Sequence, residues 1–199
     1  MRRIWAFTLT LLLVGCASEE PEVEVVEEES TVTIRSVGDI LVHSDVYTTA
    51  NMEVPVAGEE FGLSGYPQFN APPEIIDALA GAGVDIVNNA TNHSMDRGGG
   101  GVVASTGNMR ERGMLYTGSY ASEQDKLTPR IIEANGITVG FLGFTYGTNG
   151  LPVEQEHFAS LIDDTLAAQV AALDSQVDVA VVMLHMGDEY APLQNEFQE

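Results

Sequence analysis

Three short polar segments carry the residues whose types and spacing could do chemistry. They are Asp39 with His43, Asn92-His93 with Asp96, and His185. Carboxylate, carboxamide and imidazole groups are suitable ligands for a divalent transition metal. A histidine with a nearby carboxylate can also transfer a proton, because the carboxylate orients the imidazole ring. The pattern therefore predicts a metal-assisted site with an acid–base histidine, in which His93 and Asp96 are the catalytic pair.

Each segment also has a purely structural interpretation, and the sequence leaves these alternatives open. Asp39 follows Gly38 and is explained as well by a turn or a helix cap. Residues 92–96 would then be a polar loop capped by its own side chains. His185 would only cap the end of a strand.

The expected elements place the three segments at the carboxyl ends of three separate strands. Residues 32–37 alternate between apolar and polar types and predict a strand that ends at Gly38. Residues 84–87 predict a short buried strand. Residues 177–184 are almost wholly apolar, which is typical of a strand covered on both faces, and they end at His185. In layered α/β folds sites form at the carboxyl ends of strands, so we expect the segments to converge.

The other expected elements complete an α/β pattern. Residues 46–70 are expected to be irregular, and Pro72-Pro73 opens a helix. A polar loop over 88–101 precedes a helix that runs to about residue 112, followed by a brief strand at 115–117. Asn135-Gly136 predicts a tight turn in a β-hairpin of residues 130–134 and 137–144. Residues 156–173 have apolar residues at helical spacing and predict a helix.

The amino-terminal region has the pattern of an export signal. Arg2 and Arg3 precede the apolar residues 4–14, a run too short to span a bilayer. The segment Leu-Val-Gly-Cys-Ala at 13–17 resembles a bacterial lipobox, with Cys16 as the lipidated residue; the alternative is an ordinary secretory signal with an incidental cysteine. We expect a signal peptide at 1–15, a lipidated and glutamate-rich linker at 16–30, and a folded domain at 31–199. The predicted location is the bacterial cell envelope, outside the cytoplasm and anchored to a membrane by lipid.

The charge balance limits the classes of partner. The 199 residues, enough for one domain, carry 30 acidic and 8 basic side chains and a formal net charge of -22. This balance argues against a nucleic-acid partner, because phosphate binding requires clustered cations. It also argues against a polyanion as a tight ligand unless metal ions supply positive charge. Solubility alone is the simpler explanation of the acidity.

Several ordered motifs resemble one family. Residues 36–40, 51–55, 69–72, 92–96, 140–149 and 185–190 resemble the motifs of the CapA/PgsA-type capsule (poly-gamma-glutamate) synthesis family, within the calcineurin-like metallophosphatase superfamily. Together they cover most of residues 31–194. The resemblance implies a metallophosphatase-like sandwich of two β-sheets flanked by helices.

The resemblance also implies roles for individual residues. Asp39 would hold a first metal, Glu53 would bridge or hold a second one, and Asn92 and His185 would be further ligands. His93 would act as the acid beside the leaving group. The implied cofactors are divalent metal ions, Mn, Zn or Fe, with two in the site. The superfamily pattern has a histidine two residues after the first aspartate; Leu41 stands there in this chain, so His43 is the nearby candidate.

Two departures bear on function. The stretch between residues 45 and 51 is shorter than in the family, and the family's late histidine-rich segment would follow residue 194, so the resemblance implies a domain incomplete at its C-terminus. The expected function is an exported lipoprotein that handles polymer or assists assembly in capsule synthesis. The alternatives are an active metal-dependent hydrolase of a phosphoester or polyglutamate amide bond, and a binder of a small ligand. The expected partners are an anionic extracellular polymer or capsule-synthesis proteins.

Overall fold

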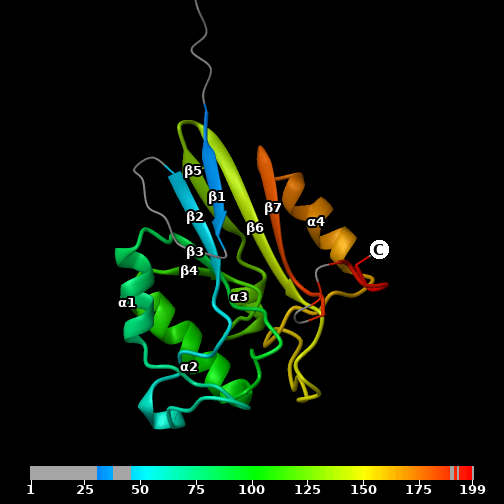
Figure 1. The fold of residues 1–199 in the computed structure, drawn as a ribbon. Coiled ribbons are helices and arrows are strands. Elements are labelled where there is room, and N and C mark those ends of the chain that lie inside the picture. The colour runs from blue at the N-terminus through cyan, green and yellow to red at the C-terminus, as the bar shows by residue number, and fades with distance from the viewer. Residues whose placement is uncertain (1–30, 38–45, 189–190, 192, 199) are drawn as a thin grey trace, which may run out of the picture.

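Two β-sheets lie face to face, with α1 and α2 on one side of the molecule and α4 on the other (Figure 1). The structure is a computed structural model that describes residues 31–37, 46–188, 191 and 193–198. This architecture confirms the predicted α/β sandwich of two sheets flanked by helices.

The first sheet is parallel and has the order β1-β2-β3-β4. Its strands are β1 (Thr33–Val37), β2 (Val46–Asn51), β3 (Ile86–Asn88) and β4 (Leu115–Thr117). A 3-10 helix, η1 (Glu59–Phe61), and the helices α1 (Glu74–Gly81) and α2 (Gly98–Glu111) belong to the connections of this sheet. A cluster of buried apolar side chains packs this part of the molecule, and it includes Ile76 of α1, Val87 of β3 and Met109 of α2.

The second sheet has the order β5-β6-β7. The strands β5 (Arg130–Ala134) and β6 (Ile137–Thr145) form the predicted hairpin, and β7 (Val179–His185) pairs with β6 in parallel. The turn residues Asn135 and Gly136 have φ angles of 53° and 76°, as an Asn-Gly hairpin turn requires. Two further helices, α3 (Glu123–Lys126) and α4 (Leu166–Asp174), lie before β5 and before β7.

The two sheets meet around a second apolar cluster and at one very close contact. Ile86 of β3 and Phe141 of β6 are buried in that cluster. Nearby, Gly143 of β6 lies against the side chain of the fully buried Asn88. A Cβ atom added at residue 143 would come within 2.2 Å of Asn88 Oδ1, so only glycine allows this approach. The contact fixes β3, and the chain that follows β3, against the second sheet.

Two predicted elements differ from the structure in the first half of the chain. Residues 46–51 form β2 rather than irregular chain, because they pair on both sides with β1 and β3. The local sequence, with its two polar threonines, does not predict this strand, because its hydrogen bonds are made with other segments of the chain. Helix α2 begins at Gly98, inside the expected loop. There Gly99 packs against the Phe158 ring, which an added Cβ would approach to 2.3 Å.

The predicted helix over residues 156–173 is wrong in its first half, since α4 begins only at Leu166. The preceding chain pairs with the end of β6 instead, because Ile162 N donates to Thr145 O and Thr145 N donates to Ser160 O, both at 2.9 Å. Asp163 Oδ1 then accepts hydrogen bonds from the backbone and hydroxyl of Thr165, and this turn sets the start of the helix.

Strand β7 is less buried than its apolar sequence predicts. Val181 and Met183 pack against the cluster between the sheets, and α4 contacts the strand from outside. However, β7 is the edge strand of its sheet, so Val179 and Leu184 are 37% and 41% exposed. An apolar run shows that a strand is covered, but it does not show whether the strand is central.

Tyr116, Asp125 and Arg130 tie β4, α3 and β5 together. Tyr116 Oη donates to Asp125 Oδ2 at 2.7 Å, and Arg130 Nη2 lies 2.5 Å from Asp125 Oδ1. Burial opposes ionisation of Asp125, but hydrogen bonds from Tyr116, Ala121 and Arg130 outweigh it and hold the pKa of Asp125 below its ordinary value. Burial, followed by the hydrogen bond and negative charge of Asp125, raises the pKa of Tyr116 to about 12.

This cluster predicts a loss of stability at alkaline pH. Since the folded state binds the Tyr116 proton more tightly than the unfolded state does, the stabilisation is complete below about pH 10 and is lost as the pH rises towards 12. The loss should amount to about 2–3 kcal/mol. Urea unfolding of the wild type and of Tyr116→Phe should show a smaller decline in that window for the variant. Equal declines in the two proteins would contradict the assignment.

Candidate active site

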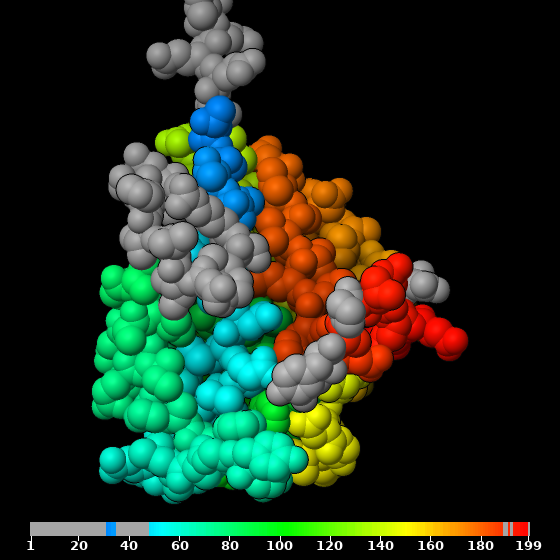
Figure 2. All heavy atoms as spheres, in the orientation of Figure 1, coloured from blue at the N-terminus to red at the C-terminus, as the bar shows by residue number. Residues whose placement is uncertain are grey.

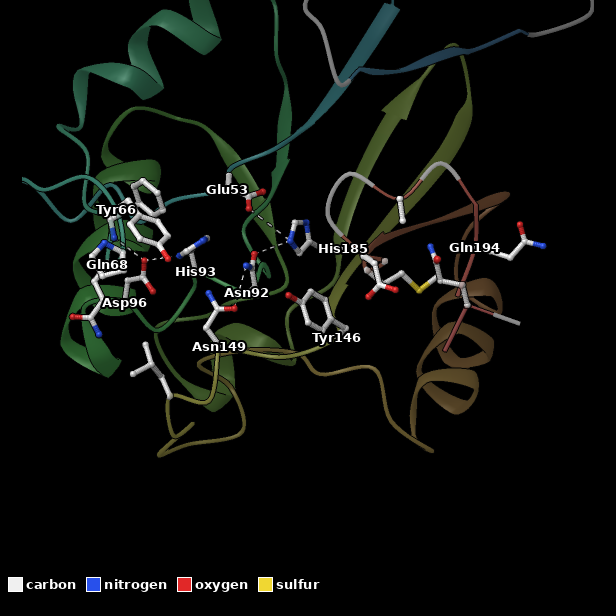
Figure 3. Close-up of a pocket in the computed structure, with 18 of the residues that line it drawn as sticks. Glu53, Tyr66, Gln68, Asn92, His93, Asp96, Tyr146, Asn149, His185 and Gln194 are labelled. Atoms are coloured by element: carbon white, nitrogen blue, oxygen red, sulfur yellow. Dashed lines mark hydrogen bonds and ion pairs between the residues drawn. The ribbon is translucent and has the colours of Figure 1, made fainter. Parts of the chain in front are cut away.

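A cleft of about 920 Å³ opens where the chain leaves β2, β3, β6 and β7 (Figure 3). Glu53 lines the cleft from the segment after β2. Asn92 and His93 come from the loop after β3, and Asn149 comes from the segment after β6. His185 is the last residue of β7. Figure 2 shows the segment after β2 (cyan) and β7 (orange) close together on one face of the molecule. Of the three segments expected to converge, those at residues 92–96 and at His185 line this cleft.

The side chains of Glu53, Asn92 and His185 form a group of three residues of the types that bind metal ions, called the donor group below. His185 Nε2 lies 2.9 Å from Asn92 Oδ1 and 3.8 Å from Glu53 Oε1. Ligand atoms about 2.1 Å from a shared cation are about 3.0–3.4 Å apart, so the two separations lie on either side of that range, and the shorter one is a direct hydrogen bond. Histidine, cysteine, aspartate and glutamate alone form no such group of three within the described part of the chain; here the third donor is a carboxamide. The three residue types suit a divalent metal ion, and the three side chains line one cleft.

His93 and Asp96 form the predicted pair in the same cleft. His93 Nδ1 lies 2.7 Å from Asp96 Oδ2, which also accepts the backbone N–H of Phe69 at 2.7 Å. Asp96 is buried at 5% exposure, and the Phe69 ring meets the imidazole edge-to-face at 4.7 Å. Because Nδ1 is occupied by Asp96, Nε2 of His93 is the atom that is free to exchange a proton with a ligand.

The loop that carries Asn92 and His93 is held by buried hydrogen bonds. Thr91 Oγ1 donates to Glu53 O at 2.7 Å, which joins this loop to the segment after β2. Ser94 Oγ accepts from Thr91 N and donates to Asn89 O, each at 2.8 Å. Thr91 and Ser94, which are not the residues singled out from the sequence, thus hold the loop in place. Asn92 and His93 are left to face the cleft.

Asp39 and His43 lie outside the described residues, so their predicted places as metal ligands stay predictions. The same holds for Cys16 and for the signal peptide and linker at residues 1–30. Among the residues that the structure describes, none of the helices is both long and apolar enough to cross a bilayer.

Several residues of the cleft were not predicted from the sequence to have a role there. Tyr146 stacks on the His185 ring at 6.1 Å, and Asn92 Nδ2 donates to Asn149 Oδ1 at 3.2 Å. Both residues follow β6, whose neighbour β7 ends at His185. A signal was present in the sequence, because residues 146–149 are a polar segment that directly follows the apolar strand of residues 137–145. Phe69 was missed because it contributes its backbone N–H, which sequence patterns do not reveal.

The charges in the cleft are negative. Glu53, Asp96 and Asp188 line it, and no lysine or arginine does so among the described residues. The sequence contains no lysine or arginine after Arg130. A cation is therefore favoured in the cleft, and an anionic ligand would need one to offset the repulsion.

A family model described as bacterial capsule synthesis protein PGA_cap matches residues 18–199. The chain belongs to this family. The match confirms the resemblance to CapA-type proteins drawn from the motifs. Two curated relatives are similar over most of this chain. Capsule biosynthesis protein CapA of Bacillus anthracis is 29% identical over 197 residues, covering 92% of this chain and 47% of the relative. PGA biosynthesis protein CapA of Bacillus subtilis (strain 168) is 24% identical over 181 residues, covering 84% and 46%.

The chain thus spans about half the length of the curated relatives that it matches. Two solved structures are similar in fold to part of this chain. A Staphylococcus aureus protein described as a 5'-nucleotidase gives a TM-score of 0.46 at 16% identity, covering 75% of this chain and 30% of its own. The NAD nucleotidase NadN of Haemophilus influenzae gives 0.43 at 14% identity, covering 74% and 26%.

Proposed function

We propose that this chain acts in bacterial capsule synthesis, as a metal-dependent hydrolase of a phosphoester or polyglutamate amide bond. Membership of the PGA_cap family and the two CapA relatives support the process. One observation supports the reaction: the His93–Asp96 pair shares a cleft with the donors Glu53, Asn92 and His185. Figure 3 shows His93 between Asp96 and Asn92.

The proposed location is the cell envelope. The basic start, the short apolar run and the cysteine of residues 1–17 support export and lipid attachment at Cys16. Partners at that location would be an anionic extracellular polymer or other capsule-synthesis proteins, and the net charge argues against nucleic acid.

The chemistry divides between a cation and two side chains. A divalent cation held by Glu53, Asn92 and His185 would supply the positive charge that polarises the scissile group and activates water. Asp96 holds the Nδ1 side of His93, so the imidazole keeps one orientation and presents Nε2 to the cleft. In the imidazolium form Nε2 can donate its proton to the leaving group, which prevents expulsion of an unstable anion.

A second candidate is a component that handles polymer without cleaving it. The cleft carries uncharged amide side chains on opposite sides, Gln68 beside Asp96 and Gln194 beyond His185 (Figure 3). Amide groups offer both hydrogen-bond donors and acceptors to a polyamide chain. This lining supports binding of an extended polymer whether or not a bond is cut.

The experiment removes and restores metal. Purified chain is treated with chelator, and hydrolysis of a chromogenic phosphate ester and of poly-gamma-glutamate is measured before and after addition of Mn, Zn or Fe. We expect cleavage of at least one substrate that disappears with the metal and returns with it. Folded protein that binds metal and polymer but cleaves neither substrate would favour the handling role. Folded protein that binds no metal would reject the proposed site.

A further inference from the structure

The segment after β6 contacts two residues of the cleft, His185 and Asn92. Tyr146 N donates to His185 O at 3.0 Å, and the Tyr146 ring stacks on the imidazole. Three residues later, Asn149 Oδ1 accepts from Asn92 Nδ2. One short segment thus contacts both His185 and Asn92, two of the three residues of the donor group.

The orientation of the Asn92 carboxamide decides whether this residue can bind a cation. The carboxamide has one oxygen acceptor and one NH₂ donor at nearly equivalent positions, so a flip would turn donor hydrogens toward the site. In the structure Oδ1 faces His185 and Nδ2 faces Asn149. A partner that accepts from Nδ2 therefore favours the orientation in which the oxygen is available to metal.

The backbone holds Asn149 in place for this contact. Asn149 has a φ angle of 53° and Gly150 one of 78°, both left-handed, as in the tight Asn-Gly turn at residues 135–136. The turn is closed by Leu151 N donating to Thr148 O at 3.0 Å and by Thr148 Oγ1 donating to Leu151 O at 2.6 Å. Asparagine is one of the few residues with a side chain that accepts this backbone readily.

We infer that Asn149 is a positioning residue that fixes the Asn92 carboxamide with its oxygen toward the metal site. The inference rests on the proposed function, because it assigns Asn92 Oδ1 to a cation. Loss of a residue that hydrogen-bonds a metal ligand typically lowers metal affinity about 10- to 100-fold. Because Asn149 is exposed, water competes for its hydrogen bond, so we expect an effect near the lower limit.

The test compares two glycine variants at matched turns. Asn149→Gly keeps the left-handed backbone and removes the acceptor, and we expect its dissociation constant for Mn²⁺ to rise about 10-fold by calorimetry. Asn135→Gly makes the same change in the hairpin turn far from the cleft and should bind Mn²⁺ as the wild type does. In Asn149→Asp the side chain can only accept, so affinity should stay at or above that of the wild type.

A second readout needs no metal. In protein with ¹⁵N-labelled asparagine, the Asn92 carboxamide signals are those lost in Asn92→Ala. They should shift in Asn149→Gly and remain in place in Asn135→Gly. Unchanged Mn²⁺ affinity in Asn149→Gly, or an equal loss in Asn149→Asp, would overturn the inference. A wild-type chain with no affinity for Mn²⁺ would reject the proposed function itself, and the inference with it, whatever the carboxamide signals show.

Discussion

Replacing His93 with alanine is expected to lower kcat of the metal-loaded chain by about 100- to 10,000-fold, the usual contribution of a positioned acid or base. The reason is that Nε2 of His93 is the proton donor free to reach a ligand, since Nδ1 is held by Asp96. Metal affinity should stay within about 3-fold of the wild type, because His93 is bonded to Asp96 and is outside the donor group. Steady-state kinetics and a Mn²⁺ titration measure the two effects.

The chain provides a matched control in His157. Its Nδ1 lies 4.0 Å from Glu123 Oε2 and its ring meets Phe158 edge-to-face at 4.5 Å. Like His93 it is thus flanked by a carboxylate and an aromatic ring, but the carboxylate is farther away and His157 does not line the cleft. His157→Ala should leave kcat unchanged. If His93→Ala retained full kcat in folded protein, the acid role of His93 would be wrong, and the handling role would gain support.

Replacing His185 with alanine is expected to weaken Mn²⁺ binding by at least about 100-fold, beyond the 10- to 100-fold typical of lost outer partners. Nε2 of His185 lies between the other two members of the donor group, 2.9 Å from Asn92 Oδ1 and 3.8 Å from Glu53 Oε1. Imidazole is also the ligand of this group that is best suited to Zn or Fe. Activity should fall with the loss of metal.

The neighbouring residue controls for damage to β7. Leu184 precedes His185 on the same strand, is 41% exposed and does not line the cleft. Leu184→Ala should bind Mn²⁺ like the wild type. A folded His185→Ala protein with unchanged affinity would show that the three donors do not hold the metal.

The sequence by itself determined the features that depend on local chemistry. Apolar runs and turn residues predicted β1, β6 and β7 and the hairpin turn at Asn135-Gly136, with small shifts in their ends. The position of polar residues directly after strands predicted that Asn92 and His185 would meet. Their 2.9 Å contact agrees with this: β3 and β7 belong to different sheets, and the chain after β3 meets the end of β7 where the two sheets pack together.

Only the tertiary structure decided features whose hydrogen bonds come from distant segments. Residues 46–51 become a strand because β1 and β3 pair with them, and the chain before α4 becomes extended because β6 does. A single segment carries no record of such partners, so its local pattern favoured irregular chain in one case and helix in the other.

The two Asn-Gly turns show the same division. Both have left-handed backbones with φ angles of 53° at the asparagine, and local chemistry is sufficient to explain each turn. The Asn135 side chain donates to Thr31 O, whereas the Asn149 side chain accepts from Asn92 at the cleft. The difference lies entirely in which distant segment the fold brings beside each turn, because a side-chain contact across more than fifty residues depends on packing and not on local sequence.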